Sequence, residues 1–113
     1  MIIISSKNIV KFLTSNFANA ITLFPFILVK SKKMKKDFEL INHEKIHLRQ
    51  QIEMLVLPFY VWYLTEFLIH FIRLKSKEKA YFNISFEKEA YANQHNLSYL
   101  KKRKFWAFIK FCS

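Results

Sequence analysis

A long segment without basic residues constrains the fold of this chain more than any other feature. Residues 50–72 contain no Lys or Arg. The overlapping stretch 54–74, MLVLPFYVWYLTEFLIHFIRL, is long enough to cross a bilayer as a helix. Within it, Pro58 interrupts helical hydrogen bonding, and Glu66 and His70 stand one turn apart, where they can pair on one face. The stretch is therefore expected to be a membrane span, a helix lying in a membrane surface or a buried core helix.

The positive charge of the chain limits the classes of partner that it is expected to bind. Nineteen Lys and Arg residues face eight Asp and Glu residues, which gives a net charge of +11. The basic residues gather in three groups, at 30–36, 73–79 and 101–104. Such groups usually mark solvated faces, and anionic lipid headgroups are the next partner that they indicate. Because no segment resembles a nucleic-acid-reading motif, we expect no specific nucleic acid partner.

The N-terminus is not expected to be a signal peptide, because its apolar start precedes any positive charge. The expected location is cytoplasmic, either soluble or associated with the inner face of a membrane. One domain spanning residues 1–113 is the natural count for this length.

The chain has no Gly and a single Cys, Cys112. The missing Gly excludes a phosphate-binding glycine loop, a dinucleotide fingerprint, a serine nucleophile elbow and a calcium loop. The single Cys excludes an internal disulfide framework and a thiolate zinc site. Any metal must therefore be held by His and carboxylate side chains.

The pattern of residues predicts an α+β fold, with short N-terminal strands followed by three helical segments. Residues 2–5 and 21–29 are β-branched and aromatic, which is typical of strands. Pro25 makes the second of them an edge strand or a bulged one. Residues 8–17 fit a helix or a strand, and the lysine-rich 30–36 is expected to be a loop or turn.

The remainder is predicted to be helical. Asp37 is a suitable N-cap for a helix that begins at the next residue and that Pro58 ends or kinks. A second helix is expected at 59–74, followed by a charged connection at 75–84. Ser85 is a suitable N-cap for a last helix that runs past residue 99.

The motif that carries chemistry is His43-Glu44-Lys45-Ile46-His47. On a helix, residues at i and i+4 lie one above the other, so both imidazoles can reach one metal ion. Glu44 lies one step round the helix, where it can accept a proton from a water on the metal. Zinc is the expected metal for this set of ligands. The same pattern also occurs on ordinary helix surfaces.

A catalytic zinc usually has a third protein ligand. The best candidate in the sequence is Glu87, in the segment FEKEAYAN, with Glu89 as the alternative. Ala90 lies three residues after Glu87 and would allow this helix to pack closely on the helix of the motif. Acids at this position also stabilise a helix N-terminus without any metal.

Together, HExxH and a helical Glu-x-x-Ala some forty residues later resemble the gluzincins, zinc peptidases whose third ligand is a Glu on a later helix. FEKEAYAN resembles the E-x-E-A-D segment of membrane-embedded gluzincins such as the CAAX prenyl protease group. The size of the chain is similar to that of the minigluzincins, and about residues 20–95 also resemble a family of small bacterial proteins. The resemblance implies a zincin-like minimal core and zinc held by His43, His47 and Glu87. It further implies Glu44 as the general base and a peptide or protein substrate.

Three features depart from the gluzincin pattern. Tyr91 stands where the membrane enzymes have an Asp that supports the His ligands. There is no room for a large substrate-binding domain. The strand that would align a substrate, residues 21–29, is interrupted by Pro25. A donor to the oxyanion would come from His95 or Tyr91, although Tyr91 also suits a core position. The alternatives to a metallopeptidase are an inactive zinc-binding module and a small basic membrane-associated protein with an incidental motif.

Overall fold

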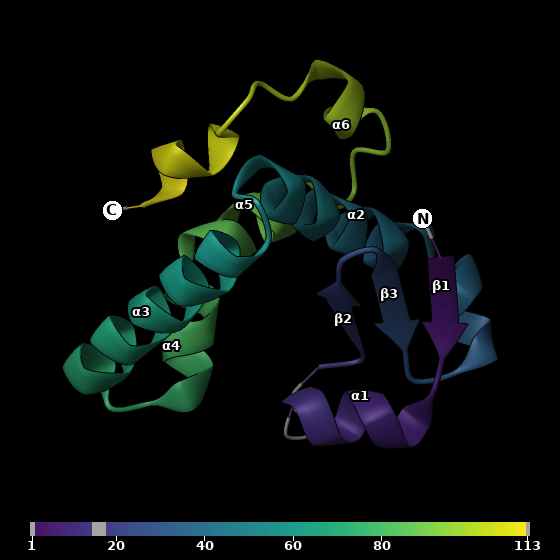
Figure 1. Cartoon of the computed structure of the whole chain (residues 1–113), viewed down its shortest axis with the longest axis horizontal. Coiled ribbons are helices and arrows are strands. Elements are labelled where there is room, and N and C mark those ends of the chain that lie inside the picture. Colours follow the sequence, from purple (N-terminus) through teal and green to yellow (C-terminus); the bar gives the residue numbers. More distant parts are fainter. Residues whose placement is uncertain (1, 15–17, 113) are drawn as a thin grey trace.

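The computed structural model describes residues 2–14 and 18–112 and confirms an α+β fold. Its three-stranded sheet has the order β1-β3-β2. β1 (Ile2–Ser5) runs parallel to β3 (Phe26–Val29), and β2 (Ala20–Leu23) runs antiparallel to β3. The strand expected at residues 2–5 is confirmed. Figure 1 shows the sheet on one side of the molecule, α3 and α4 on the other, and α2 above the sheet.

The single strand expected at 21–29 is wrong, because this stretch forms a hairpin. β2 and β3 pair through four residues each, and Phe24 and Pro25 make the turn between them, with a cis peptide bond. Pro25 therefore lies outside both strands, which suits a residue that cannot donate to a β-ladder. In consequence, β2 is an edge strand without a proline.

Helices α1 and α2 follow from local sequence. α1 (Lys7–Thr14) resolves the ambiguity of 8–17 in favour of helix up to residue 14, and 15–17 lie outside the described residues. Residues Lys32–Lys36 form a short 3₁₀ turn, η1. α2 (Phe38–Glu53) begins where predicted, because the Asp37 carboxylate accepts a hydrogen bond from the Leu40 backbone N–H at 3.1 Å.

One face of the sheet packs on α2. Ala20, Ile27 and Val29 point to this face, as the alternation of side chains along strands requires, and they form a buried cluster with Ile41 of α2. The sheet therefore supports the helix that carries the HExxH motif.

α2 stops before Pro58, and α3 (Leu57–Leu74) carries this proline in its first turn, where a missing N–H has no cost. The helix axis bends by 114° from α2 to α3. Within the described residues, no single helix is long and apolar enough to cross a membrane, and α2 and α3 meet that test only together, as a bent pair. The expectation of a buried core helix is wrong for α3, because Phe59 is its one buried residue.

The C-terminal half contains more and shorter helical elements than expected. The connection predicted at 75–84 is largely helix, α4 (Lys77–Asn83), capped by the Ser76 hydroxyl and packed beside α3 (Figure 1). α5 (Ser85–Asn93) ends well before residue 99, and α6 (Tyr99–Lys102) and the 3₁₀ turn η2 (Ala107–Phe111) follow. Asn42 of α2 explains the early end, since its side-chain amide donates to the backbone carbonyls of Asn93, Gln94 and Asn96.

The pairing of Glu66 with His70 is also wrong. Glu66 instead accepts from the backbone N–H of Ser85 at 2.7 Å and from its hydroxyl at 2.6 Å. The cap of α5 is therefore the Glu66 carboxylate, and Ser85 is the first residue of the helix rather than its N-cap. His70 lies beside Arg73.

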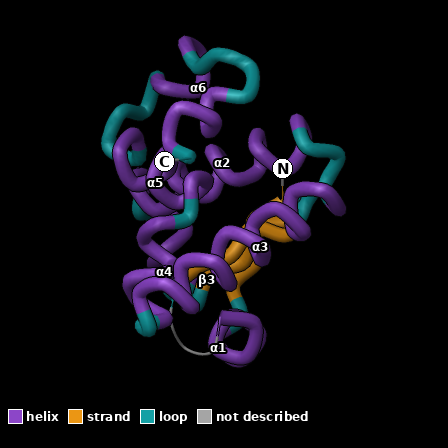
Figure 2. The backbone as a smooth tube through the Cα atoms, turned by 90° about the vertical axis from the view of Figure 1, so that its left-hand side faces the viewer, coloured by secondary structure: helices purple, strands orange, loops and turns teal. Residues whose placement is uncertain are grey.

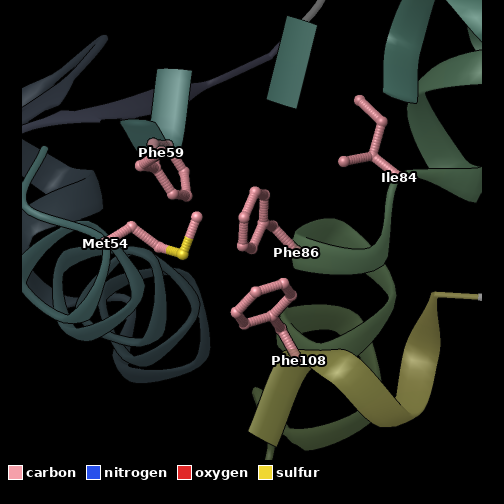
Figure 3. Close-up of a cluster of buried hydrophobic side chains, with 5 residues drawn as sticks. All are labelled: Met54, Phe59, Ile84, Phe86 and Phe108. Carbon is pink, nitrogen blue, oxygen red and sulfur yellow. The ribbon is translucent and has the colours of Figure 1, made fainter. Parts of the chain in front are cut away.

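A second buried cluster joins the helices to one another. Figure 3 shows the ring of Phe86 between those of Phe59 and Phe108, with the side chain of Met54 directed at them. The ring centroids of Phe86 lie 4.4 Å from Phe59 and 4.5 Å from Phe108. α2 contributes Ile41 to the first cluster, and Met54 at its C-terminal end belongs to the second. Figure 2 shows α1 at the opposite end of the molecule from α6.

At the junction of α2 and α3, residues other than Gly adopt positive φ, because the chain contains no Gly. Leu55 and Val56 both have positive φ, and Val56 (φ 64°, ψ −69°) is the centre of a tight turn closed by the Leu57 N–H and the Leu55 carbonyl at 2.8 Å. A β-branched residue is strained in this region, typically by about 1–3 kcal/mol.

We predict that Val56→Gly raises the free energy of unfolding by about 1 kcal/mol, because Gly adopts positive φ without a steric penalty. The matched control is Val61→Gly in the interior of α3, which should lower it by about 1 kcal/mol. Urea unfolding measures both, and a Val56→Gly protein less stable than wild type would contradict the strain.

Candidate metal centre

Four polar side chains from two helices meet in the interior of the molecule. α2 presents His43, Glu44 and His47, and α5 presents Glu87; all four are buried. His43 Nε2 lies 3.1 Å from His47 Nε2, and Glu87 Oε1 lies 3.1 Å from the first nitrogen and 3.0 Å from the second. The structure thus brings the two His residues and Glu87 to one point. His43, Glu44 and His47 offer ligand atoms within 4.8 Å of one another, a group that can hold a metal ion.

The proton on His47 can be assigned from its neighbours. His47 Nδ1 lies 2.8 Å from Gln50 Oε1. The Gln50 amide cannot be turned round, because its nitrogen donates to the carbonyl of Phe86 at 3.1 Å and to Glu89 at 2.9 Å. His47 Nδ1 must therefore carry the hydrogen and donate it. In the neutral ring, Nε2 then presents a lone pair to Glu87.

His43 has an equivalent arrangement. Its Nδ1 lies 2.7 Å from Gln94 Oε1, which leaves Nε2 to face Glu87 and His47. With both imidazoles neutral, two nitrogen lone pairs and one carboxylate oxygen point at the same small volume. Such a cluster is repulsive unless a proton or a metal cation lies between its members. Ligand atoms around one tetrahedral zinc ion are about 3.3 Å apart, close to the separations found here.

The electrostatics of the group favour positive charge at this point. Burial lowers the pKa of His47, but the carboxylates of Glu87 and Glu44 outweigh this effect and raise the pKa to about 9. Burial raises the pKa of Glu87, but the two imidazoles outweigh it and hold the pKa below its ordinary value. An ionised Glu87 between two imidazoles is what a cation site requires.

Glu44 lies beside this point and is tied to the edge strand. Its Oε1 accepts from the Thr22 hydroxyl at 2.7 Å, and its backbone carbonyl lies 3.0 Å from the same hydroxyl. Burial raises the pKa of Glu44, and the nearby imidazoles only partly offset that rise. A carboxylate with a raised pKa and a fixed orientation is suited to accept and return a proton near neutral pH.

Gln51 holds β2 against α2. Its amide donates to the Thr22 carbonyl at 2.8 Å and accepts from the Phe24 N–H at 2.9 Å, as the backbone of a neighbouring strand would. The position of Gln51, one turn after His47, thus serves the sheet.

Three tyrosines surround the site. Tyr63 of α3 donates to Glu87 Oε2 at 2.6 Å, which fixes the carboxylate so that Oε1 faces the imidazoles. Tyr91 packs edge-on against the His43 ring, with centroids 4.3 Å apart, and its hydroxyl lies 3.0 Å from that of Tyr81. The other proposed donor, His95, is exposed in the turn after α5 and lines neither of the pockets beside the site.

Glu89, the alternative third ligand, has a different set of partners. It accepts from Arg103 through both oxygens and from Tyr99 at 2.7 Å. Arg103 also donates to Glu53 at 2.5 Å. Hydrogen bonds therefore run from the C-terminal Arg103 through Glu89 and Gln50 to His47, and the basic run at 101–104 supplies a buried structural residue.

Two pockets open on the metal centre. One, of about 390 Å³, lies between β2, α3 and α4, and its walls include Glu44, His47 and Glu87. The other, of about 310 Å³, has His43 and Tyr91 in its wall. Ala20, Glu44 and Tyr81 line both, so the pockets meet at the edge strand.

Comparison with models of known protein families, with curated proteins and with solved structures finds no match to this chain. What the chain does must therefore be argued from the geometry of the site.

The sequence indicated Gln50, three residues after His47, and Gln94, two turns after Glu87, as polar residues near the site, but without a definite role. It gave no indication of Thr22, which holds Glu44, or of Tyr63, which holds Glu87, and only their contacts reveal them. Gln94 and Gln50 lie within hydrogen-bonding distance of the outer ring nitrogens of His43 and His47. The one feature that could have drawn attention to Tyr63 is its place as a polar residue within the apolar stretch of α3.

We predict that the purified protein binds about one zinc ion per chain, and that His43→Ala and Glu87→Gln each weaken binding by more than a hundredfold, because each removes a ligand. Competition with a chromophoric chelator measures the affinities. His95→Ala is the matched control and should leave the affinity unchanged. Unaltered binding in Glu87→Gln would remove Glu87 from the ligand set.

We also predict that Gln50→Met weakens zinc binding by about tenfold to a hundredfold, because His47 Nδ1–H loses its acceptor while its volume is kept. The neighbouring Gln51→Met breaks only the contact with β2 and should leave zinc affinity within about twofold. Equal losses in both variants, measured on folded protein, would show that Gln50 has no special role.

Proposed function

We propose that this chain is a zinc-dependent metallopeptidase of the gluzincin type. The single observation that supports it best is the meeting of His43 Nε2, His47 Nε2 and Glu87 Oε1 within 3.1 Å, with the Glu44 carboxylate beside them in a pocket wall. His43, His47 and Glu87 would hold the zinc. When bound, zinc supplies Lewis acidity, which polarises a carbonyl and makes water acidic enough to lose a proton near neutral pH.

Glu44 is the general base of this proposal. It takes the proton from the attacking water and returns it to the amine that leaves when the peptide bond breaks. Thr22 holds one oxygen of Glu44 in place throughout. Tyr63, by fixing Glu87, keeps the third ligand oriented. Thr22, Glu44 and Glu87 are buried and Tyr63 is partly buried, so bulk water has little access to the base.

The edge strand β2 can position an extended substrate only along its first residues, because Gln51 already pairs with the Thr22 carbonyl and the Phe24 N–H. Every second residue of an antiparallel edge strand turns its backbone N–H and C=O away from the partner strand. β2 lies beside Glu44 and lines both pockets, and the proline that interrupted the expected strand lies beyond its end. The objection that Pro25 raised against a peptidase therefore does not apply to β2.

A donor for the oxyanion comes from the tyrosines in this proposal. Tyr91 stands at the mouth of one pocket, and the hydroxyl of Tyr81 is within hydrogen-bonding distance of it. His95 has no part, because it lines neither pocket.

We predict that Glu44→Gln lowers peptide turnover by at least a hundredfold while zinc affinity stays close to that of the wild type, since Glu44 moves protons and is not a ligand. Turnover is measured on a mixed peptide library by mass spectrometry. Glu78→Gln, at an exposed position of α4 that lines neither pocket, removes the same charge and should leave turnover unchanged. Zinc binding without turnover of any peptide by the wild type would favour an inactive zinc-binding module instead.

A further inference from the structure

The outer face of α3 is apolar, whereas a helix exposed to water normally presents polar side chains on that face. Its most exposed line of side chains is entirely aliphatic and runs along its whole length, with exposed fractions between 47% and 75%: Leu57, Val61, Leu64, Leu68 and Ile72. These positions are three or four residues apart, so they form one continuous stripe. We call it the α3 stripe.

Two polar side chains of the same helix, Tyr63 and Glu66, point inward, whereas Thr65 is exposed beside the α3 stripe. Tyr63 donates to Glu87, and Glu66 accepts from Ser85 at the start of α5. Trp62 and Ile69 widen the apolar face, and with Leu57 and Val61 they line a cavity of about 750 Å³ on this side. Exposed apolar surface of this extent and continuity marks a site of interaction.

Positive charge lies next to the α3 stripe. Arg73, Lys75, Lys77 and Lys79 are all exposed and surround the end of α3 and the start of α4, and only Glu78 offsets them in this segment. Figure 1 shows these two helix ends together at the tip of the α3–α4 pair, remote from the sheet. An apolar stripe with a cluster of cations at its end complements the acyl region and the anionic headgroups of a bilayer.

We propose that the α3 stripe and its four cations dock this protein on the surface of an anionic membrane, with α3 lying in the plane of the interface. A second copy of the chain is a poorer occupant, because two molecules of charge +11 repel each other. By length and composition, α3 alone does not meet the test for a membrane-spanning helix. This inference does not rest on the proposed peptidase activity.

Docking also places the metal centre in relation to the membrane. Phe59, Tyr60, Tyr63 and Phe67, on the inner side of α3, line the pocket that contains Glu44 and Glu87. One side of α3 would thus contact lipid, while its other side forms a wall of the pocket.

Sedimentation with vesicles tests the proposal. The zinc-loaded protein should sediment with vesicles of equal parts phosphatidylcholine and phosphatidylglycerol, and at least tenfold less with pure phosphatidylcholine. Raising the salt concentration should weaken binding to the anionic vesicles, because part of the attraction is electrostatic.

Two sets of substitutions separate the apolar and charged contributions. Val61→Gln with Leu68→Gln should weaken binding at least tenfold, and so should Lys75→Gln with Lys79→Gln. Phe38→Gln, which is 71% exposed at the start of α2, is the matched apolar control and should bind as the wild type does. An unchanged far-ultraviolet circular dichroism spectrum shows that each variant is folded.

Three results would overturn the proposal. The first is no binding to either kind of vesicle. The second is binding that survives Val61→Gln with Leu68→Gln, which would place the contact elsewhere. The third is a dimer in solution that this pair of substitutions dissociates, which would make the α3 stripe a protein interface.

Discussion

The structure depends on how the repulsion between two buried imidazole nitrogens and a buried carboxylate oxygen is relieved. Two imidazole nitrogens and a carboxylate oxygen are held within 3.1 Å of one another in the interior of the molecule. Burying polar groups in this way has a cost of several kcal/mol unless they are satisfied. The surrounding residues do not let the cluster relax: Gln50 and Gln94 hold the outer nitrogens of the rings, and Tyr63 holds the other oxygen of Glu87. A metal cation at this point would turn the repulsion into coordination, and a proton on His47, whose pKa is raised to about 9, would also relieve it.

Much of the remaining fold can be understood as support for this cluster. The sheet packs on α2 through Ala20, Ile27 and Val29, and Gln51 and Thr22 tie its edge to the helix next to Glu44. On the other side, Phe59, Phe86 and Phe108 hold α3, α5 and η2 together. Hydrogen bonds from Arg103 through Glu89 and Gln50 connect the C-terminal segment to His47. A chain of 113 residues thus devotes a large share of its buried polar groups to one site.

Local signals in the sequence predicted what depends on local interactions. The Asp37 cap, the start of α2 and the spacing of His43 and His47 need only nearby residues, and so does the first strand. The errors have non-local causes. The turn at Phe24 and Pro25 is fixed by the pairing of β2 with β3, α5 ends where Asn42 captures three carbonyls, and Glu66 is taken by Ser85 instead of His70. The proximity of Glu87 to the two imidazoles was suggested by the sequence because a catalytic zinc usually has three protein ligands, whereas Tyr63 had no signature of its own.

The most direct test of the account is a crystal structure of the zinc-loaded protein with anomalous diffraction data collected at the zinc edge. The account predicts one strong anomalous peak, about 2.0–2.2 Å from His43 Nε2, His47 Nε2 and an oxygen of Glu87, with Glu44 close to it but outside the ligand set. A peak at any other position would contradict the account. So would a zinc ion bound by the two imidazoles while Glu87 points away from it.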